Sequence, residues 1–108
     1  MRDYQIYSKI NRISEVRNEF LKVKEKDSHH LKFLGMFNYC KSHIKDEYLQ
    51  ILQKSFFNRN QTYQFWWMDY YSKSSYYRKR FIAVNSFVSL FEMIYENFND
   101  NSNFIKFA

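Results

Sequence analysis

The chain has 108 residues, a formal net charge of +6, and 22% aromatic residues. A chain of this length forms one domain, and one glycine with no proline leaves few of the turn residues that β-hairpins use. The single cysteine cannot form an internal disulfide, and no apolar run reaches the ~18 residues of a membrane span. The first residues also lack the apolar region of a signal peptide. We therefore expect a helical, cytoplasmic protein.

The first half of the chain is predicted to form three amphipathic helices. Apolar residues recur there at steps of three and four, the period of one helix face. Asp27 or Ser28 is suited to cap the second helix, and the third begins near Asp46. The apolar positions are Ile6, Ile10, Ile13, Val16, Phe20 and Val23 in the first helix (residues 4–25), Leu31, Leu34, Phe37, Cys40 and Ile44 in the second, and Tyr48, Leu49, Leu52 and Phe56 in the third.

The second half is predicted to contain a turn and two further helices. Residues 58–62 (NRNQT) include no apolar residue and suit a turn. Thr62 is suited to cap a short helix over residues 63–70, and Ser72 to cap a longer one. The apolar stripe of the longer helix fades at residues 99–103, and the apolar tail that follows has no assigned role. That stripe comprises Tyr76, the stem of Arg80, Ala83, Phe87, Leu90, Phe91 and Ile94.

Together these elements predict an all-α fold, a small bundle of about five helices in a single domain over residues 1–108. A short helix, a tight bend and a capped longer helix are the layout of a helix-turn-helix, which we expect over residues 62–91. Residues 1–47 are expected to be a helical N-terminal part that serves packing or association.

Positive charge is concentrated on the predicted helix pair. Between residues 53 and 91 the only acidic residue is Asp69, against six lysines and arginines. The first turn of a helix presents unpaired N–H groups and the positive end of the helix dipole, which favour phosphate. Each cation that contacts a phosphate also releases counterions from a duplex, and arginine commonly reads guanine. The predicted DNA-binding residues are Lys73, Ser74, Ser75, Tyr77 and Arg78 on the longer helix, and Lys54 and Arg59 before it.

The order of residue types in this segment supports the same interpretation. Residues 71–87 (YSKSSYYRKRFIAVNSF) resemble the recognition helix of phage transcriptional regulators of the ArpU and RinA kind. They also resemble the C-terminal promoter-reading helix-turn-helix of bacterial sigma factors. The shared pattern is a cap serine, a basic residue, two hydroxyl residues, two aromatic or aliphatic residues and an arginine, then an alanine and a large apolar residue. Here these are Ser72, Lys73, Ser74, Ser75, Tyr76, Tyr77, Arg78, Ala83 and Phe87.

The resemblance covers roughly residues 48–91 and implies a DNA-binding transcriptional regulator or sigma-like factor. It implies that the predicted DNA-binding residues of the longer helix face DNA, while Tyr76, Ala83 and Phe87 pack inward. The preceding segment departs from the family pattern, with Trp66 at the usual alanine of the helix crossing, Asp69 at an expected leucine and Tyr70 at the usual turn glycine. Trp66 would force the two helices apart or change their angle. Because the net charge is small for tight binding by a monomer, we expect a homodimer or RNA polymerase as a further partner.

Other chemistry receives less support from the sequence. The set His29, His30, Cys40 and His43 contains metal-binding residue types, but its spacing matches no standard zinc finger and Cys40 lies on an apolar stripe. We therefore expect no metal and no other cofactor. No nucleophile with a base, no paired acids and no glycine-rich loop are present, so we do not expect an enzyme.

The aromatic run of Phe65, Trp66 and Trp67 leaves alternatives open, because it could be a ligand-stacking platform or a partner patch. Core packing is the expected role, but neighbouring residues of a helix cannot both face one core. One of the two tryptophan rings is therefore expected to meet another chain or the edge of the first helix. The alternative function is a helical protein–protein interaction module that does not bind nucleic acid and uses these rings with the amphipathic first helix.

Overall fold

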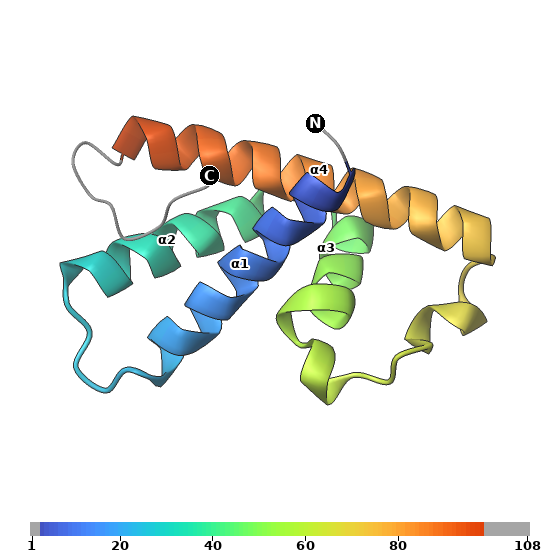
Figure 1. Cartoon of the computed structure of the whole chain (residues 1–108), viewed down its shortest axis with the longest axis horizontal. Coiled ribbons are helices and arrows are strands. Elements are labelled where there is room, and N and C mark those ends of the chain that lie inside the picture. Colours follow the sequence, from blue (N-terminus) through green and yellow to red (C-terminus); the bar gives the residue numbers. More distant parts are fainter. Residues whose placement is uncertain (1–2, 99–108) are drawn as a thin grey trace.

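A computed structural model of the chain describes residues 3–98, and every regular element in this range is helical (Figure 1). Four α-helices are present in the described range rather than about five. They are α1 (Asp3–Lys22), α2 (Ser28–Ser42), α3 (Asp46–Leu52) and α4 (Lys73–Phe98). Three short helical turns join α3 to α4, namely the π-helical turn η1 (Gln53–Phe57) and the 3-10 turns η2 (Arg59–Gln61) and η3 (Trp66–Asp69). The predicted tail after residue 98 lies outside the described residues.

The long helix α4 runs along the length of the molecule, and α1, α2 and α3 all pack against it (Figure 1). The chain after α3 swings away at one end and returns to the start of α4, so that end is built from short turns. The ion pair between Lys9 Nζ of α1 and Glu92 Oε2 of α4, 2.5 Å apart, joins the first helix to the last.

Large aromatic rings fill the space between the helices. The ring of Phe87 on α4 lies with its centroid 5.4 Å from that of Phe37 on α2 and 5.2 Å from that of Phe57 on η1. Farther along α4, Phe91 meets Phe33 of α2 with their centroids 5.3 Å apart. These rings come from three elements and are fully or almost fully buried. They therefore form one continuous core.

The predicted stripes mark most of this core. In α1 the predicted positions from Ile6 to Val16 are buried, at 0–3% exposure. In α2 the prediction is wrong at Leu31, which is 58% exposed. The buried face of that helix is instead made by Phe33, Met36, Phe37 and Cys40.

The start of α2 is stabilised by a capping box at Asp27. Asp27 is one of the two residues, with Ser28, that the sequence indicates as the cap. The Asp27 carboxylate accepts a hydrogen bond from the backbone N–H of His30 at 3.1 Å, and His30 Nδ1 accepts one from the Asp27 N–H at 3.1 Å. The bond from the His30 N–H favours the ionised carboxylate and lowers the pKa of Asp27. Two backbone groups that would otherwise lack partners are thus satisfied at the helix end.

The helix that begins at Asp46 continues as predicted but widens at its end. The N–H of Asn58 bonds to the carbonyl of Gln53 at 2.7 Å, which is the spacing of a π turn. The carbonyl of Phe56 accepts a hydrogen bond from Ser14 Oγ of α1 at 3.2 Å. The wider turn places the adjacent residues Phe56 and Phe57 in the core together.

The short helix predicted over residues 63–70 is instead the single 3-10 turn η3. Thr62 does not cap it, because Thr62 Oγ1 donates a hydrogen bond back to the carbonyl of Asn58 at 2.8 Å. The tight turn buries both Trp66 and Trp67 to about 9% exposure, which a regular helix on one core would not achieve. Burial of two tryptophan rings outweighs the weak helix propensity of this aromatic stretch.

The position of Phe87 at the centre of the core predicts a large effect of its removal. Phe87→Ala is expected to lower the free energy of unfolding by about 3–5 kcal/mol, because it leaves a cavity among three phenylalanine rings. Urea denaturation followed by circular dichroism measures this loss. Ser89→Ala, at an exposed position of the same helix, is the control and should change the free energy by no more than about 0.5 kcal/mol. Equal effects of the two variants would contradict the placement of Phe87.

Candidate nucleic-acid interface

The start of α4 is held in place by an aromatic cluster centred on Tyr76. The Tyr76 ring stacks on Trp67 with their centroids 4.5 Å apart and their planes at 4°. The Tyr76 hydroxyl forms a hydrogen bond with Ser55 Oγ of η1 at 2.5 Å. Trp66 Nε1 donates to the same Ser55 oxygen at 3.4 Å. Three separate segments therefore meet at one serine, and the direction of α4 relative to η1 is fixed.

The first turn of α4 is capped as predicted. Ser72 Oγ accepts a hydrogen bond from the backbone N–H of Ser75 at 3.2 Å, and Ser75 itself is half-buried. Lys73, Ser74 and Arg78 are exposed to solvent on this part of the helix. Ser74 and Arg78 are four residues apart, so both lie on the outward face of α4.

The three consecutive cations of α4 point in three different directions. Arg78 is exposed. Lys79 Nζ lies 2.8 Å from Glu47 Oε1 of α3, and this hydrogen bond raises the pKa of Lys79. The guanidinium of Arg80 lies against aromatic rings, with its carbon 4.6 Å from the ring centroid of Tyr77 and 4.9 Å from that of Tyr7. Only Arg78 of the three is therefore fully available to a partner on the outward face.

A second group of the predicted residues meets at a cavity of about 500 Å³ beside the start of α4, here called the aromatic pocket. Lys54 from η1, Arg59 from η2 and Tyr77 from α4 all line it, so the structure brings these three predicted residues together. Arg80 lines it too, although the sequence pattern indicates only a core role for its stem. The spacing of Arg80 from Tyr77, about one turn of α4, was the one signal that placed both on the same side.

The aromatic pocket has positive charge without a compensating acid in its lining. Among the described residues, no carboxylate forms an ion pair with Lys54, Arg59 or Arg80. The Lys54 ammonium instead lies 4.9 Å from the ring centroid of Trp66. The Nε of Arg80 is buried and has no hydrogen-bond partner within residues 3–98.

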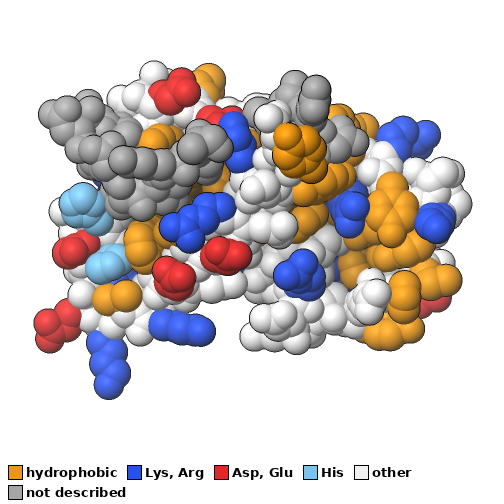
Figure 2. All heavy atoms as spheres, in the orientation of Figure 1, with side chains coloured by type: hydrophobic (Ala, Val, Ile, Leu, Met, Phe, Trp, Pro, Cys, Tyr) orange, Lys and Arg blue, Asp and Glu red, His pale blue; other side chains and the backbone are white. Residues whose placement is uncertain are grey.

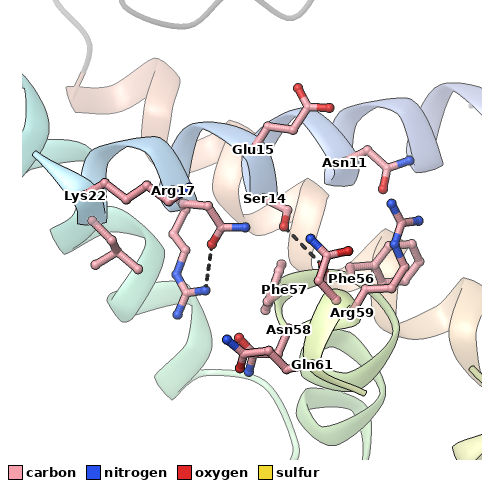
Figure 3. Close-up of a pocket in the computed structure, with 13 residues that line it drawn as sticks. Asn11, Ser14, Glu15, Arg17, Lys22, Phe56, Phe57, Asn58, Arg59 and Gln61 are labelled. Atoms are coloured by element: carbon pink, nitrogen blue, oxygen red, sulfur yellow. Dashed lines mark hydrogen bonds between the residues drawn. The ribbon is translucent and has the colours of Figure 1, made fainter. Parts of the chain in front are cut away.

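A second cleft, of about 590 Å³, lies between α1 and the chain from Phe56 to Gln61 (Figure 3). The Arg59 side chain extends across it toward Asn11 of α1, and the Arg17 guanidinium donates to Asn18 Oδ1 at 3.1 Å. Its lining is rich in amide side chains and includes one carboxylate, that of Glu15. Arg59 lines both cavities, as does Phe56, so the two cavities adjoin at these residues.

These observations define one end of the molecule, here called the cationic end, which is built from η1, η2, η3 and the N-terminal turns of α4. Figure 2 shows lysine and arginine side chains set among hydrophobic ones at this end, and acidic side chains mostly at the other, over α1 and α2. Exposed aromatic side chains flank the cations, including Tyr63, Phe65, Tyr70 and Tyr77. The cations of the cationic end that form no ion pair with an acid of residues 3–98 are Lys54, Arg59, Lys73, Arg78 and Arg80.

The tryptophans on which the protein-interaction alternative depends face inward. Trp66 and Trp67 are each about 9% exposed, and both pack on Tyr76 of the same chain. The expectation that one ring meets another chain or the edge of α1 is therefore wrong. The apolar stripe of α1 is buried as well from Ile6 to Val16.

The histidines and the cysteine do not come together. In residues 3–98 no three His, Cys, Asp or Glu side chains are grouped so that they could hold a metal ion. His30 is engaged with Asp27, and His43 Nδ1 lies 2.9 Å from the Tyr39 carbonyl oxygen. Cys40 is fully buried in the core. No helix of the described part combines the length and the apolar character needed to cross a bilayer.

The burial of Cys40 predicts an unreactive thiol. Burial raises its pKa to about 12, and only the thiolate reacts with disulfide reagents. Near pH 8 the folded protein should therefore contain roughly a thousandfold less thiolate than the unfolded chain. A colorimetric thiol assay measures the rate in buffer and in guanidinium chloride, and the expected result is one equivalent released quickly only after unfolding. Fast reaction in buffer would contradict the burial of this side chain.

Comparisons with protein-family models, with curated proteins and with solved structures found no match to this chain. The assignment of a function therefore depends on the geometry and charge of the cationic end.

Proposed function

We propose that the protein binds duplex DNA and acts as a transcriptional regulator or sigma-like factor, with the N-terminal turns of α4 in the major groove. The observation that carries the proposal is the outward face of this helix start. Lys73, Ser74 and Arg78 are exposed there, and no acidic residue follows Asp69 before Glu92.

Each of these groups has a role in the proposed complex. Lys73 and the free N–H groups of the first turn contact phosphate, where the helix dipole adds a partial positive charge. Arg78 reaches a guanine edge or a phosphate, and the Ser74 hydroxyl lies on the same face for a polar contact. Lys54 and Arg59 bind the backbone beside the groove. Tyr77, 41% exposed, lies between the outward face of α4 and the aromatic pocket.

The proposed recognition helix is supported in an unusual way. A helix-turn-helix braces its recognition helix with a preceding α-helix, whereas the segment before α4 contains the 3-10 turn η3. The contacts of Tyr76 with Trp67 and Ser55 supply the bracing here. The proposed docking therefore depends on α4 itself and on the basic residues of η1 and η2. Packed aromatic side chains take the place that the first helix has in a helix-turn-helix.

The number of available charges limits the affinity of one chain. Lys79 is neutralised by Glu47, so few cations remain for phosphate on the outward face. Specific binding by a single small module generally needs more contacts than these. The proposal therefore includes a second contact, either with another copy of the chain or with RNA polymerase.

Duplex binding should weaken steeply with salt. Three phosphate contacts give a slope of about −2.7 in a plot of log affinity against log salt, or roughly a 40-fold loss between about 50 and 200 mM. A fluorescence-anisotropy titration of a labelled random duplex at several salt concentrations measures the slope. A salt-independent affinity, or no binding at low salt, would refute the proposal.

Substitution of Arg78 tests whether the outward face of α4 contacts the duplex. Arg78→Ala is expected to weaken duplex binding by about tenfold, since it removes a charged contact in the groove. Lys24→Ala is the matched control, because it also removes one positive charge but lies exposed in the loop between α1 and α2, at the far end of the molecule (Figure 1). Its effect should stay within about twofold. If the two variants bind equally, α4 is not the docking element.

A further inference from the structure

The aromatic pocket has features that a duplex-binding helix does not require. Its lining combines the cations Lys54, Arg59 and Arg80 with two exposed rings, Phe65 at 43% and Tyr77 at 41% exposure. No acidic residue lines it. The pocket is therefore suited to a ligand that is anionic at one part and flat and unsaturated at another.

The cations can attract an anion because no carboxylate of residues 3–98 pairs with them, although aromatic rings lie against Lys54 and Arg80. Neither Lys54 nor Arg59 forms an ion pair with a carboxylate of residues 3–98, and the buried Nε of Arg80 lacks a hydrogen-bond partner there. Because no carboxylate lining the pocket compensates these positive charges, an anion that enters it would be attracted by all three cations. A phosphate oxygen is a strong acceptor and also compensates the charge.

The rings differ in how available their faces are. Tyr76 and Trp67 are stacked on each other and form a closed wall of the pocket. Phe65 and Tyr77 retain exposed surface beside the cations, and the Arg80 guanidinium lies against the Tyr77 ring, 4.6 Å from its centroid. Stacking on such rings tolerates any nucleobase, since every base has a π face. The volume of about 500 Å³ falls within the range of small-molecule sites.

We propose that the aromatic pocket holds one unpaired nucleotide, with the base against Phe65 and Tyr77 and the phosphate at Lys54, Arg59 and Arg80. The ligand class is a nucleoside monophosphate unit, supplied either by a single strand or by a free nucleotide. The site goes beyond duplex binding by the outward face of α4 and shares with it only Lys54, Arg59 and the bordering ring of Tyr77. Phe65 belongs to the pocket alone, and Arg78 to the outward face alone.

Single-strand binding tests the pocket directly. A labelled 12-residue oligothymidylate is titrated by fluorescence anisotropy against the wild-type chain and three variants. Phe65→Ala should weaken binding about tenfold through loss of stacking, while Phe65→Trp should retain it. Tyr70→Ala is the matched control, because Tyr70 is an exposed ring of the same end (67%) that does not line the pocket, and it should stay within about twofold. Circular dichroism shows that each variant is folded.

The source of the nucleotide is distinguished by competition and by tryptophan fluorescence. Trp67 lines the pocket, so occupancy should change its emission. Saturable quenching by thymidine monophosphate that displaces the oligonucleotide supports a site for free nucleotide as well. Quenching by the oligonucleotide alone supports a site for a strand.

Two outcomes would overturn the inference. Equal competition by inorganic phosphate and thymidine monophosphate would mean an anion site without base stacking. Wild-type affinity of Phe65→Ala for the oligonucleotide would mean that the pocket is not used. Neither outcome depends on duplex binding, because Arg78→Ala tests that separately and should leave oligonucleotide binding within about twofold.

Discussion

The hydrogen bond and ring stacking of Tyr76 are the interactions on which the functional end of the molecule depends. The residue lies on the inward side of α4, where its hydroxyl contacts η1 and its ring contacts η3. Its hydroxyl and its ring face bind to different segments, so a single side chain joins three pieces of chain. Because the connection from Asn58 to Ser72 contains only short turns, the start of α4 would otherwise be a free helix end, and helix ends fray when nothing packs on them.

Much of the fold follows from the apolar spacing of the sequence. The sequence pattern indicates the approximate positions of the four α-helices and of the turn after Phe57. It also indicates the caps at Asp27 and Ser72. The prediction fails over residues 63–70, where an aromatic run was interpreted as a helix. Periodicity cannot show that two neighbouring tryptophans will both be buried. Their burial depends on the side chains that η1 and α4 present to them, which lie outside residues 63–70. Leu31 was assigned to the core for a related reason, because a stripe does not show how wide the facing surface is.

The candidate site was predicted in part. The sequence pattern places Arg78 outward and the stem of Arg80 inward, but it does not show which cation pairs with an acid or which lines a pocket. On a helix each successive side chain is turned by about 100°, so Arg78, Lys79 and Arg80 reach solvent, α3 and the aromatic pocket respectively. Which of these charges meets an acid depends on Glu47, which lies 32 residues away from Lys79. Contacts of that separation are set by tertiary packing and are invisible to a local pattern.

The π turn at Gln53–Phe57 has a consequence for the chain that follows it. Such a turn holds one residue more than an α turn, so the backbone leaves it in a direction that a regular helix would not give. Removal of one residue within the turn would restore ordinary helix geometry and rotate the following chain, Arg59 included, away from its present position beside the two cavities. The number of residues in this short stretch, more than their identity, therefore sets how the chain that carries Arg59 is oriented relative to the helices.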